Sequence, residues 1–148
     1  MKPRRIRSLR GSILVDGGAI KHQLILDDGR INHGLKILSF EMWSKSSVNQ
    51  LGIDVMLCLA KLPSAQQKMN ASDNRQIAWF MGGFDNYINT TEFRSIIDPD
   101  HVINRDLFIF GDATNALWNY LIIAEEYDLS DDEAIVQIIK ETSQTSVQ

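Results

Sequence analysis

The stretch that decides the fold reads LGIDVMLCLAKL and covers residues 51–62. Its apolar residues recur at every second position, which is the period of a β-strand with one buried face. These residues are Ile53, Val55, Leu57 and Leu59. The opposite face is also mostly apolar and carries one carboxylate, that of Asp54. A strand that is apolar on both faces belongs inside a packed structure, so we expect residues 51–62 to form a central strand.

Outward from this stretch, further apolar segments alternate with turn signals at intervals of roughly ten to fifteen residues. Glycines and aspartates supply the turn conformations between them, and we expect the pairs Gly82-Gly83 and Gly111-Asp112 to end strands. Residues 116–127 also fit a helical pattern, but their β-branched and aromatic content favours a strand. The other expected strands are residues 13–15, 19–26, 35–43, 75–81, 93–97 and 102–110.

Two of these segments carry more specific expectations. In residues 35–43, strict alternation places Leu38, Phe40 and Met42 on one face. Residues 63–74 are long and polar, and they are expected to form an exposed loop.

One helix is expected, near the C-terminal end of the sequence. Ser130 and Glu133 have the spacing of a capping box, and Leu129 and Ala134 occupy the positions of a hydrophobic staple. We expect the helix to cover about residues 131–141. The sequence thus predicts a mainly β protein: a single-domain, jelly-roll-like β-sandwich of about seven or eight strands with a short C-terminal helix. The expected units are a basic arm at residues 1–12, the sandwich at 13–129, and the helix and tail at 130–148.

Charge is distributed unevenly along the chain. The net charge is −4, yet the first ten residues hold five of the fifteen basic residues and no acidic one. Pro3 and the mutual repulsion of these charges predict an extended arm. Its cations can neutralise phosphates without sequence specificity, or they can strap the arm onto an acidic subunit surface. The candidate binding residues are Lys2, Arg4, Arg5, Arg7 and Arg10.

The sequence contains no motif for a metal centre, a hydrolase or a phosphate-binding loop, and it indicates neither an enzyme nor a cofactor. The weak candidates for a divalent ion or for acid–base chemistry are Asp98, Asp100 and His101, although an aspartate before proline favours a simple turn. Asp54 is expected to pair with an arginine, such as Arg75 or Arg105.

The remaining reactive and aromatic side chains are expected to pack. Cys58 lies in the central apolar strand, where a thiol usually serves as a small hydrophobe. Trp43, Trp79 and Trp118 could stack on bases or sugars if exposed, but each lies in an expected strand, which favours packing. No apolar run approaches the roughly 20 residues of a membrane span, and the basic start lacks the apolar core of a leader, so a soluble protein is expected.

The arginine-rich start MKPRRIRSLR, followed by an eight-strand-like β domain, resembles the small single jelly-roll capsid proteins of viruses and phages. The resemblance implies a non-catalytic, self-assembling virion protein whose arm faces the genome or laces subunits together. It also implies that both termini bind neighbouring subunits. The alternative is a stand-alone cytoplasmic β-sandwich or β-barrel, either a binding module or an enzyme, with a pocket near residues 98–101.

Overall fold

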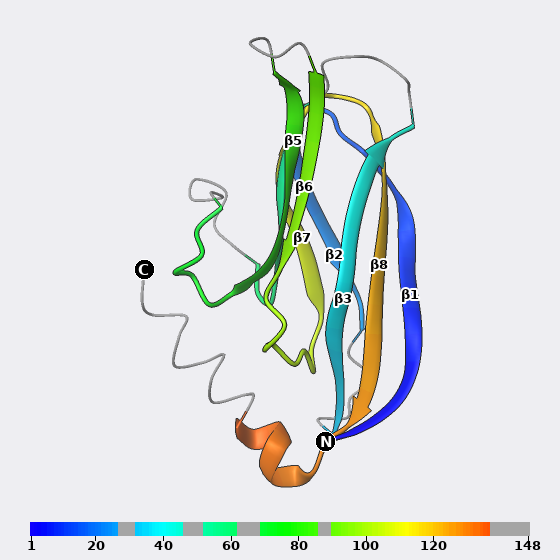
Figure 1. Ribbon diagram of the computed structural model, residues 1–148, viewed down its shortest axis with the longest axis vertical. Coiled ribbons are helices and arrows are strands. Elements are labelled where there is room, and N and C mark those ends of the chain that lie inside the picture. Colours follow the sequence, from blue (N-terminus) through cyan, green and yellow to red (C-terminus); the bar gives the residue numbers. More distant parts are fainter. Residues whose placement is uncertain (27–31, 46–51, 62–68, 86–89, 137–148) are drawn as a thin grey trace.

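The computed structural model describes residues 1–26, 32–45, 52–61, 69–85 and 90–136. They form two antiparallel sheets that pack face to face (Figure 1), so the predicted β-sandwich is confirmed. One sheet has the strand order β1-β8-β3 and the other has the order β2-β7-β4-β5-β6. The strands are β1 (Lys2–Leu14), β2 (Ala19–Leu24), β3 (His33–Ser44), β4 (Ile53–Cys58), β5 (Gln76–Asp85), β6 (Thr90–Ile97), β7 (Leu107–Ala113) and β8 (Leu117–Asp128).

The connectivity is jelly-roll-like. Early strands pair with late ones, β1 with β8 and β2 with β7, while β4 pairs with β5 in the middle of the chain. A fully wound jelly roll would also pair β3 with β6. Here β6 pairs with β5 instead, and it meets β3 through a side chain: Ser95 Oγ donates a hydrogen bond of 2.6 Å to the carbonyl oxygen of Phe40.

Strand β4 is central, as the sequence predicts. It lies between β7 and β5 in the middle of the five-stranded sheet. Val55 and Leu57 enter the core between the sheets, while Met56 and Cys58 form a second cluster with Phe110 on the outer face. Cys58 therefore packs as expected, and burial raises the pKa of its thiol well above the ordinary value. Both faces of this strand are covered, which explains its two-sided apolar pattern.

Two glycines that were expected to end strands lie inside them instead. At Gly82, a Cβ atom would lie 2.3 Å from the ring of Phe93 on β6. At Gly111, with φ of +148°, a Cβ atom would lie 2.1 Å from the carbonyl oxygen of Asp54 on β4. These glycines do not turn the chain. They are needed because a neighbouring strand approaches too closely for any side chain.

Strand β3 contains an irregularity that strict alternation does not predict. The register with β8 shifts between Ile37 and Ser39. The inward-facing residues are odd-numbered before this shift and even-numbered after it. Ile37 and Phe40 are both buried, whereas Leu38 is exposed. The expectation that Leu38 shares a face with Phe40 and Met42 is therefore wrong, because the bulge turns Leu38 away from the core.

The ambiguous segment at residues 116–127 is a strand, as predicted. It forms most of β8, the middle strand of the three-stranded sheet. Alternate residues point into the core, among them Trp118, Tyr120, Ile122 and Ala124. The bounds of the expected strands shift, most clearly in three places: the short strand expected at 13–15 is the end of β1, which stops at Leu14, β2 ends at Leu24, and β7 begins only at Leu107.

The basic start of the chain is extended, but it is not a separate arm. Residues Lys2–Leu14 form β1, which pairs with β8 along its whole length. The expected boundary at residue 13 falls inside this strand, so the basic segment belongs to the sandwich. Pairing with β8 satisfies the backbone, and acidic residues of β8 offset the arginine charges.

The capping box at the C-terminal helix is confirmed. Glu133 N donates to Ser130 Oγ at 3.2 Å, and Ser130 N donates to Glu133 Oε1 at 3.1 Å. The staple residues Leu129 and Ala134 are buried with Val102. The helix begins at residue 131, while its expected end near 141 and most of the expected loop at 63–74 lie outside the described residues. Within the described part of the chain, no helix is long and apolar enough to cross a membrane.

Candidate functional site: an arginine-lined cavity

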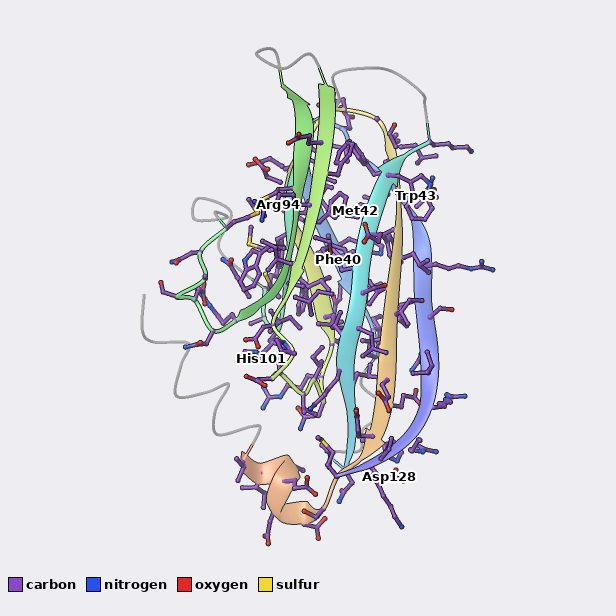
Figure 2. All side chains as sticks on the ribbon, viewed as in Figure 1. Phe40, Met42, Trp43, Arg94, His101 and Asp128 are labelled. Atoms are coloured by element: carbon purple, nitrogen blue, oxygen red, sulfur yellow. The ribbon has the colours of Figure 1, made fainter. Side chains whose placement is uncertain are left out.

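A cavity of about 470 Å³ opens between the two sheets at the end of the sandwich where β1 begins and β8 ends. Figure 2 marks this end by the label of Asp128. The walls come from β1, β3 and β8 of one sheet and from segments that flank β2 and β7 of the other. The lining residues are Arg4, Arg5, Arg7, Ile25, Leu26, His33, Gly34, Leu35, Ile103, Asn104, Arg105 and Glu126.

Strand alternation aims arginines into this cavity. On β1, Arg7 lies in the same series of alternate residues as Leu9 and Ile13, which pack against the core. Glu126 continues the inward series of β8 after Ala124. Towards this end of the sandwich, the interior therefore changes from apolar to charged.

Glu126 is held by two of the arginines. Arg5 Nε donates to Glu126 Oε2 at 2.6 Å, and Arg7 Nη1 donates to Glu126 Oε1 at 3.1 Å. The hydrogen bond from Arg5, joined by that from Arg7, lowers the pKa of Glu126 below its ordinary value. The same bond to Glu126 raises the pKa of Arg5. This carboxylate, whose side chain is only 12% exposed, stays ionised and positions both guanidinium groups.

The rim of the cavity is held by Arg4. Its Nη1 lies 3.4 Å from Nε2 of His33, and its Nε lies 3.5 Å from a carboxylate oxygen of Asp128. His33 is the first residue of β3 and Asp128 is the last residue of β8, and the two are paired with each other in register. Arg4 thus links all three strands of the smaller sheet at this end.

Asn104 supplies the unusual feature of the site. It is 8% exposed, and neither Nδ2 nor Oδ1 has a hydrogen-bond partner among the residues that the structure describes. Its neighbour Ile103 is fixed to Leu35 of β3 by two backbone hydrogen bonds of 2.7 Å. A buried polar group without a partner destabilises a protein by roughly 1–3 kcal/mol. Asn104 therefore lies at a fixed backbone position beside the cavity, with both polar atoms of its amide buried and unpaired within the described part of the chain.

The electrostatics of the lining favour an anion. Four arginines and one carboxylate, that of Glu126, line the cavity, and Arg4 is also paired with Asp128 at its rim. A guanidinium group presents five N–H donors in a planar array that matches phosphate and carboxylate oxygens. The arrangement can bind an oxyanion.

Comparison with protein-family models, with curated proteins and with solved structures finds no match to this chain. The geometry of the described residues therefore carries the functional argument.

The structure divides the five basic residues that the sequence singles out as one set. Arg4, Arg5 and Arg7 line the cavity, whereas Lys2 and Arg10 are exposed and do not. Arg10 lines a neighbouring cavity of about 330 Å³, together with Leu9 and Tyr120 among others. The acidic surface that Arg5 and Arg7 bind belongs to this chain's own β8.

Sequence reasoning missed several members of the site, among them Glu126, Asn104 and Arg105. Arg105 was considered only as a partner for Asp54, and Asn104 was not considered at all. Both lie inside the strand expected at residues 102–110, which in fact begins only at Leu107, and no local pattern indicates that this segment meets the start of β1. Only the pairing of Leu35 with Ile103 brings them to the cavity.

Asp54 does not have the partner that the sequence suggests. Arg75 pairs with Asp73 at 2.8 Å, and Arg105 lines the cavity. Asp54 is exposed, and its register partner on β7 is Asp112. Desolvation, and then the nearby charge of Asp112, raise the pKa of Asp54. A solvated face, not an ion pair, accommodates this carboxylate.

The cluster at residues 98–101 forms a turn. Asp100 N donates to Asp98 Oδ1 at 3.0 Å, and His101 Nδ1 lies 2.9 Å from Asp98 Oδ2. Both contacts tie the cluster to itself, as expected for an aspartate that initiates a turn. A search of the described residues finds no group of three or more histidine, cysteine or acidic side chains that could hold a metal ion.

The three tryptophans have different surroundings. Trp118 is fully buried, and its Nε1 donates to the carbonyl oxygen of Thr114 at 2.9 Å. Trp79 is partly buried against Met56 and Cys58. Trp43, labelled in Figure 2, is 48% exposed and does not pack in the core, so of the core or interface packing that was expected only an interface is left for it.

Proposed function

We propose that this chain is a structural, self-assembling protein of the capsid type, and that copies meet through the outer face of the sheet β1-β8-β3. The observation that carries the proposal is the apolar content of that face. Leu14 is 73% exposed and Trp43 is 48% exposed. Such residues rarely gather on the surface of a monomeric protein unless they contact a partner. Ile6 and Leu38 are exposed in the same sheet.

The middle strand of this face continues the apolar surface. Leu117, Leu121 and Ile123 of β8 are only half-buried. Leu14 lies opposite Leu117 in register, so the two side chains are neighbours on the sheet. On the outer face of the other sheet, the apolar residues Met56, Cys58 and Phe110 are instead covered by Trp79 and other side chains.

A second copy is the partner that suits this face. Basic and acidic residues, Lys36 and Arg10 against Glu41 and Glu125, are interspersed with its apolar side chains. A surface that carries both signs of charge can be complementary to itself across a two-fold axis. The edge of β1 is less suitable, because Pro3 and the cations discourage strand-to-strand addition.

In this proposal the exposed cations Lys2 and Arg10 provide nonspecific contact with nucleic acid, and the assembly is a virion component. The three arginines of β1 that line the cavity stabilise the sandwich through Glu126 and Asp128. The capsid-type assignment is supported by the jelly-roll-like strand order together with the basic segment on its outer strand.

Sedimentation velocity of the purified chain tests the proposal. We expect a species larger than the monomer whose proportion rises with concentration, and we expect Trp43→Glu to shift it to monomer. Ile96→Glu is the matched control, because Ile96 is similarly exposed but lies on β6 of the other sheet. A wild-type chain that stays monomeric at its solubility limit would overturn the proposal.

The second candidate function is a stand-alone binding module in the cytoplasm. The arginine-lined cavity favours it, because guanidinium groups match the oxygens of a small anion. The pocket of such a module would lie at this cavity and not near Asp98, which does not line it. A monomeric chain that binds a small anion would favour this alternative over self-assembly.

A further inference from the structure

We propose that the contact between His22 and Tyr120 is a pH-sensitive latch, which holds the two sheets together at neutral pH and loosens at mildly acidic pH. The latch lies at the edge of the sandwich between β1 and β2, which we call the open edge because both cavities lie there. The inference does not depend on the proposed function, because it concerns the interior of the sandwich and not its outer face.

His22 lies on the inward side of β2. Ile20 and Leu24, two positions away on either side, are buried in the core between the sheets, so strand alternation directs the imidazole the same way. The side chain of His22 is half-buried. Strand β2 is an edge strand of its sheet, with β7 on one side. The histidine therefore stands between the two sheets at an edge held by one row of backbone hydrogen bonds.

Tyr120 meets His22 from the other sheet. The hydroxyl oxygen of Tyr120 on β8 lies 3.4 Å from Nε2 of His22, and the two ring centroids are 5.5 Å apart. Gly11 of β1 lies opposite Tyr120 in register and leaves room for its ring, since a Cβ atom there would lie 2.8 Å from the hydroxyl oxygen. The contact joins the sheets at the open edge, as the bond from Ser95 to Phe40 does between β6 and β3.

The three histidines of the sequence differ in what lies beside them. His33 Nε2 lies 3.8 Å from a carboxylate oxygen of Asp128, and His101 Nδ1 lies 2.9 Å from one of Asp98. A positive charge on either imidazole would have an acidic partner. Among the residues that the structure describes, no carboxylate forms such a pair with His22, whose polar contact is a neutral hydroxyl.

The groups on the neighbouring strands also disfavour a cation at this position. From β1, Arg7 and Arg10 line the cavity that Tyr120 shares. From β7, the register partner of His22 is the apolar residue Ile109. Protonation would add a third positive charge to this edge.

The carboxylates of this edge are engaged elsewhere or exposed. Asp106, just before β7, accepts hydrogen bonds from the side chain of Gln23 and from the backbone N–H of Leu26. Asp112, near the other end of β7, is exposed, and so is Lys21 on the outward side of β2. Neither carboxylate is paired with the imidazole.

Protonation of His22 therefore places a poorly compensated cation between the sheets. Burial lowers the pKa of His22 below its ordinary value of 6.5, because desolvation disfavours the charged imidazole. A histidine with a depressed folded-state pKa stabilises the fold fully above the ordinary value, and this stabilisation is lost as the pH falls from there through the folded pKa. Glu126 titrates in a separate range, below 4.5, so its ion pairs persist while the latch loosens.

Hydrogen–deuterium exchange of the full chain at about pH 7.5 and about pH 5.5 tests the inference, with labelling times scaled for the slower intrinsic exchange at the lower pH. One unit below roughly 6.5, charged imidazole in water exceeds neutral imidazole by about tenfold, so exchange in β1 and β2 should quicken by up to about tenfold. Strands β3 and β6 at the other edge should keep their protection.

His22→Gln should remove the pH difference, because glutamine keeps a polar group for Tyr120 but does not titrate in this range. His33→Gln is the matched control: it removes a histidine that has a carboxylate beside it, and it should retain the wild-type difference. Trp43→Glu, which tests the assembly proposal, should also retain the difference, so the two proposals can fail separately.

Three outcomes would overturn the inference. One is equal protection of β1 and β2 at both pH values in the wild-type chain. A second is a pH difference that persists in His22→Gln. A third is a loss of protection as large in β3 and β6 as in β1 and β2, which would indicate global destabilisation. An NMR titration of the wild-type imidazole signals covers the case in which His22→Gln does not fold: a His22 that titrates at or above 6.5 contradicts the latch.

Discussion

The two long edges of the sandwich are closed in different ways. At the edge between β3 and β6, Phe40 contacts Phe80 with ring centroids 6.1 Å apart, and Phe80 stacks on Phe93 at 5.9 Å. Ser95 then bonds the two sheets through the carbonyl oxygen of Phe40. Figure 2 shows Phe40 on β3, on the side that faces β6. At the edge between β1 and the end of β2, two cavities of about 470 and 330 Å³ lie between the sheets.

The side chains at the two edges differ. The inward positions of β1 are Arg7, Leu9, Gly11 and Ile13, and none is aromatic. At Gly11 the space that a side chain would fill is taken by the ring and hydroxyl of Tyr120. Aromatic rings fill one edge of this sandwich, while smaller apolar and charged groups leave cavities at the other. Four substitutions test this contrast.

The largest expected effect is at the closed edge. Phe40→Ala should lower the free energy of unfolding by about 3–5 kcal/mol, because it removes a fully buried ring and leaves a cavity between the sheets. Urea denaturation measures the loss. Trp43→Ala on the same strand is the control and should change stability little, since Trp43 is half exposed. Equal losses in the two variants would show that the closed edge does not depend on its aromatic packing.

At the open edge, a substitution should have the opposite sign. Asn104→Leu should raise the free energy of unfolding by about 1–2 kcal/mol, because it removes a buried amide whose polar atoms have no partner. Thermal and urea denaturation in the absence of ligand measure the gain. Asn32→Leu is the control: Asn32 Nδ2 donates to the carbonyl oxygen of Leu129, so its replacement should destabilise the protein. A loss of stability in Asn104→Leu would mean that the amide is satisfied in the folded chain.

A smaller effect is expected for the bond that joins the two sheets. Ser95→Ala should lower the free energy of unfolding by about 0.5–1.5 kcal/mol, since it removes the donor to the Phe40 carbonyl. Urea denaturation again gives the value. Ser12→Ala is the control, because it removes a hydroxyl that donates to Asn119 within the sheet β1-β8-β3. This site is exposed, so the loss of stability should be smaller. Identical results for the two serines would remove the special role given to the contact between β3 and β6.

The smallest expected effect is the pH dependence at the cavity. The folded-state pKa of Glu126 lies below its ordinary value of 4.5, so its ion pairs stabilise the protein fully above that pH. This stabilisation is lost as the pH falls from about 4.5 through the folded pKa. The charged groups that share its cavity are Arg4, Arg5, Arg7 and Arg105, with His33 at the rim.

Glu126→Gln removes the titrating group and should reduce the loss of stability between neutral pH and about pH 3. The difference should be modest, because Arg5 and Arg7 are partly exposed and solvent screens the interaction. Urea denaturation at both pH values, for wild type and variant, measures it. Parallel pH profiles for the two proteins would contradict the role assigned to Glu126.

Local patterns in the sequence predicted much of this fold. The two-sided apolar run of β4, the strand at 117–128 and the capping box at Ser130 each depend on residues that are close in sequence. Gly82, Gly111 and the bulge at Leu38 were misread because the reason for each lies on a neighbouring strand. A glycine that gives room to another strand has the same local signature as one that turns the chain.

The candidate site was predictable only in part. The cluster of basic residues on β1 is a local signal, and three of its five members line the cavity. Asn104 and Arg105 are almost a hundred residues away, and topology alone places them opposite β1. Their place beside the cavity therefore could not be predicted before the sheet order was known.

The pairing of β1 with β8 also has a consequence during synthesis. The three-stranded sheet cannot form until β8 has left the ribosome, after roughly 100 further residues and about 5–20 s of translation. During that time β1 has no partner for its backbone. Its arginines keep it solvated and repel other unpaired strands, so the charges that later line the cavity first protect the nascent chain from aggregation.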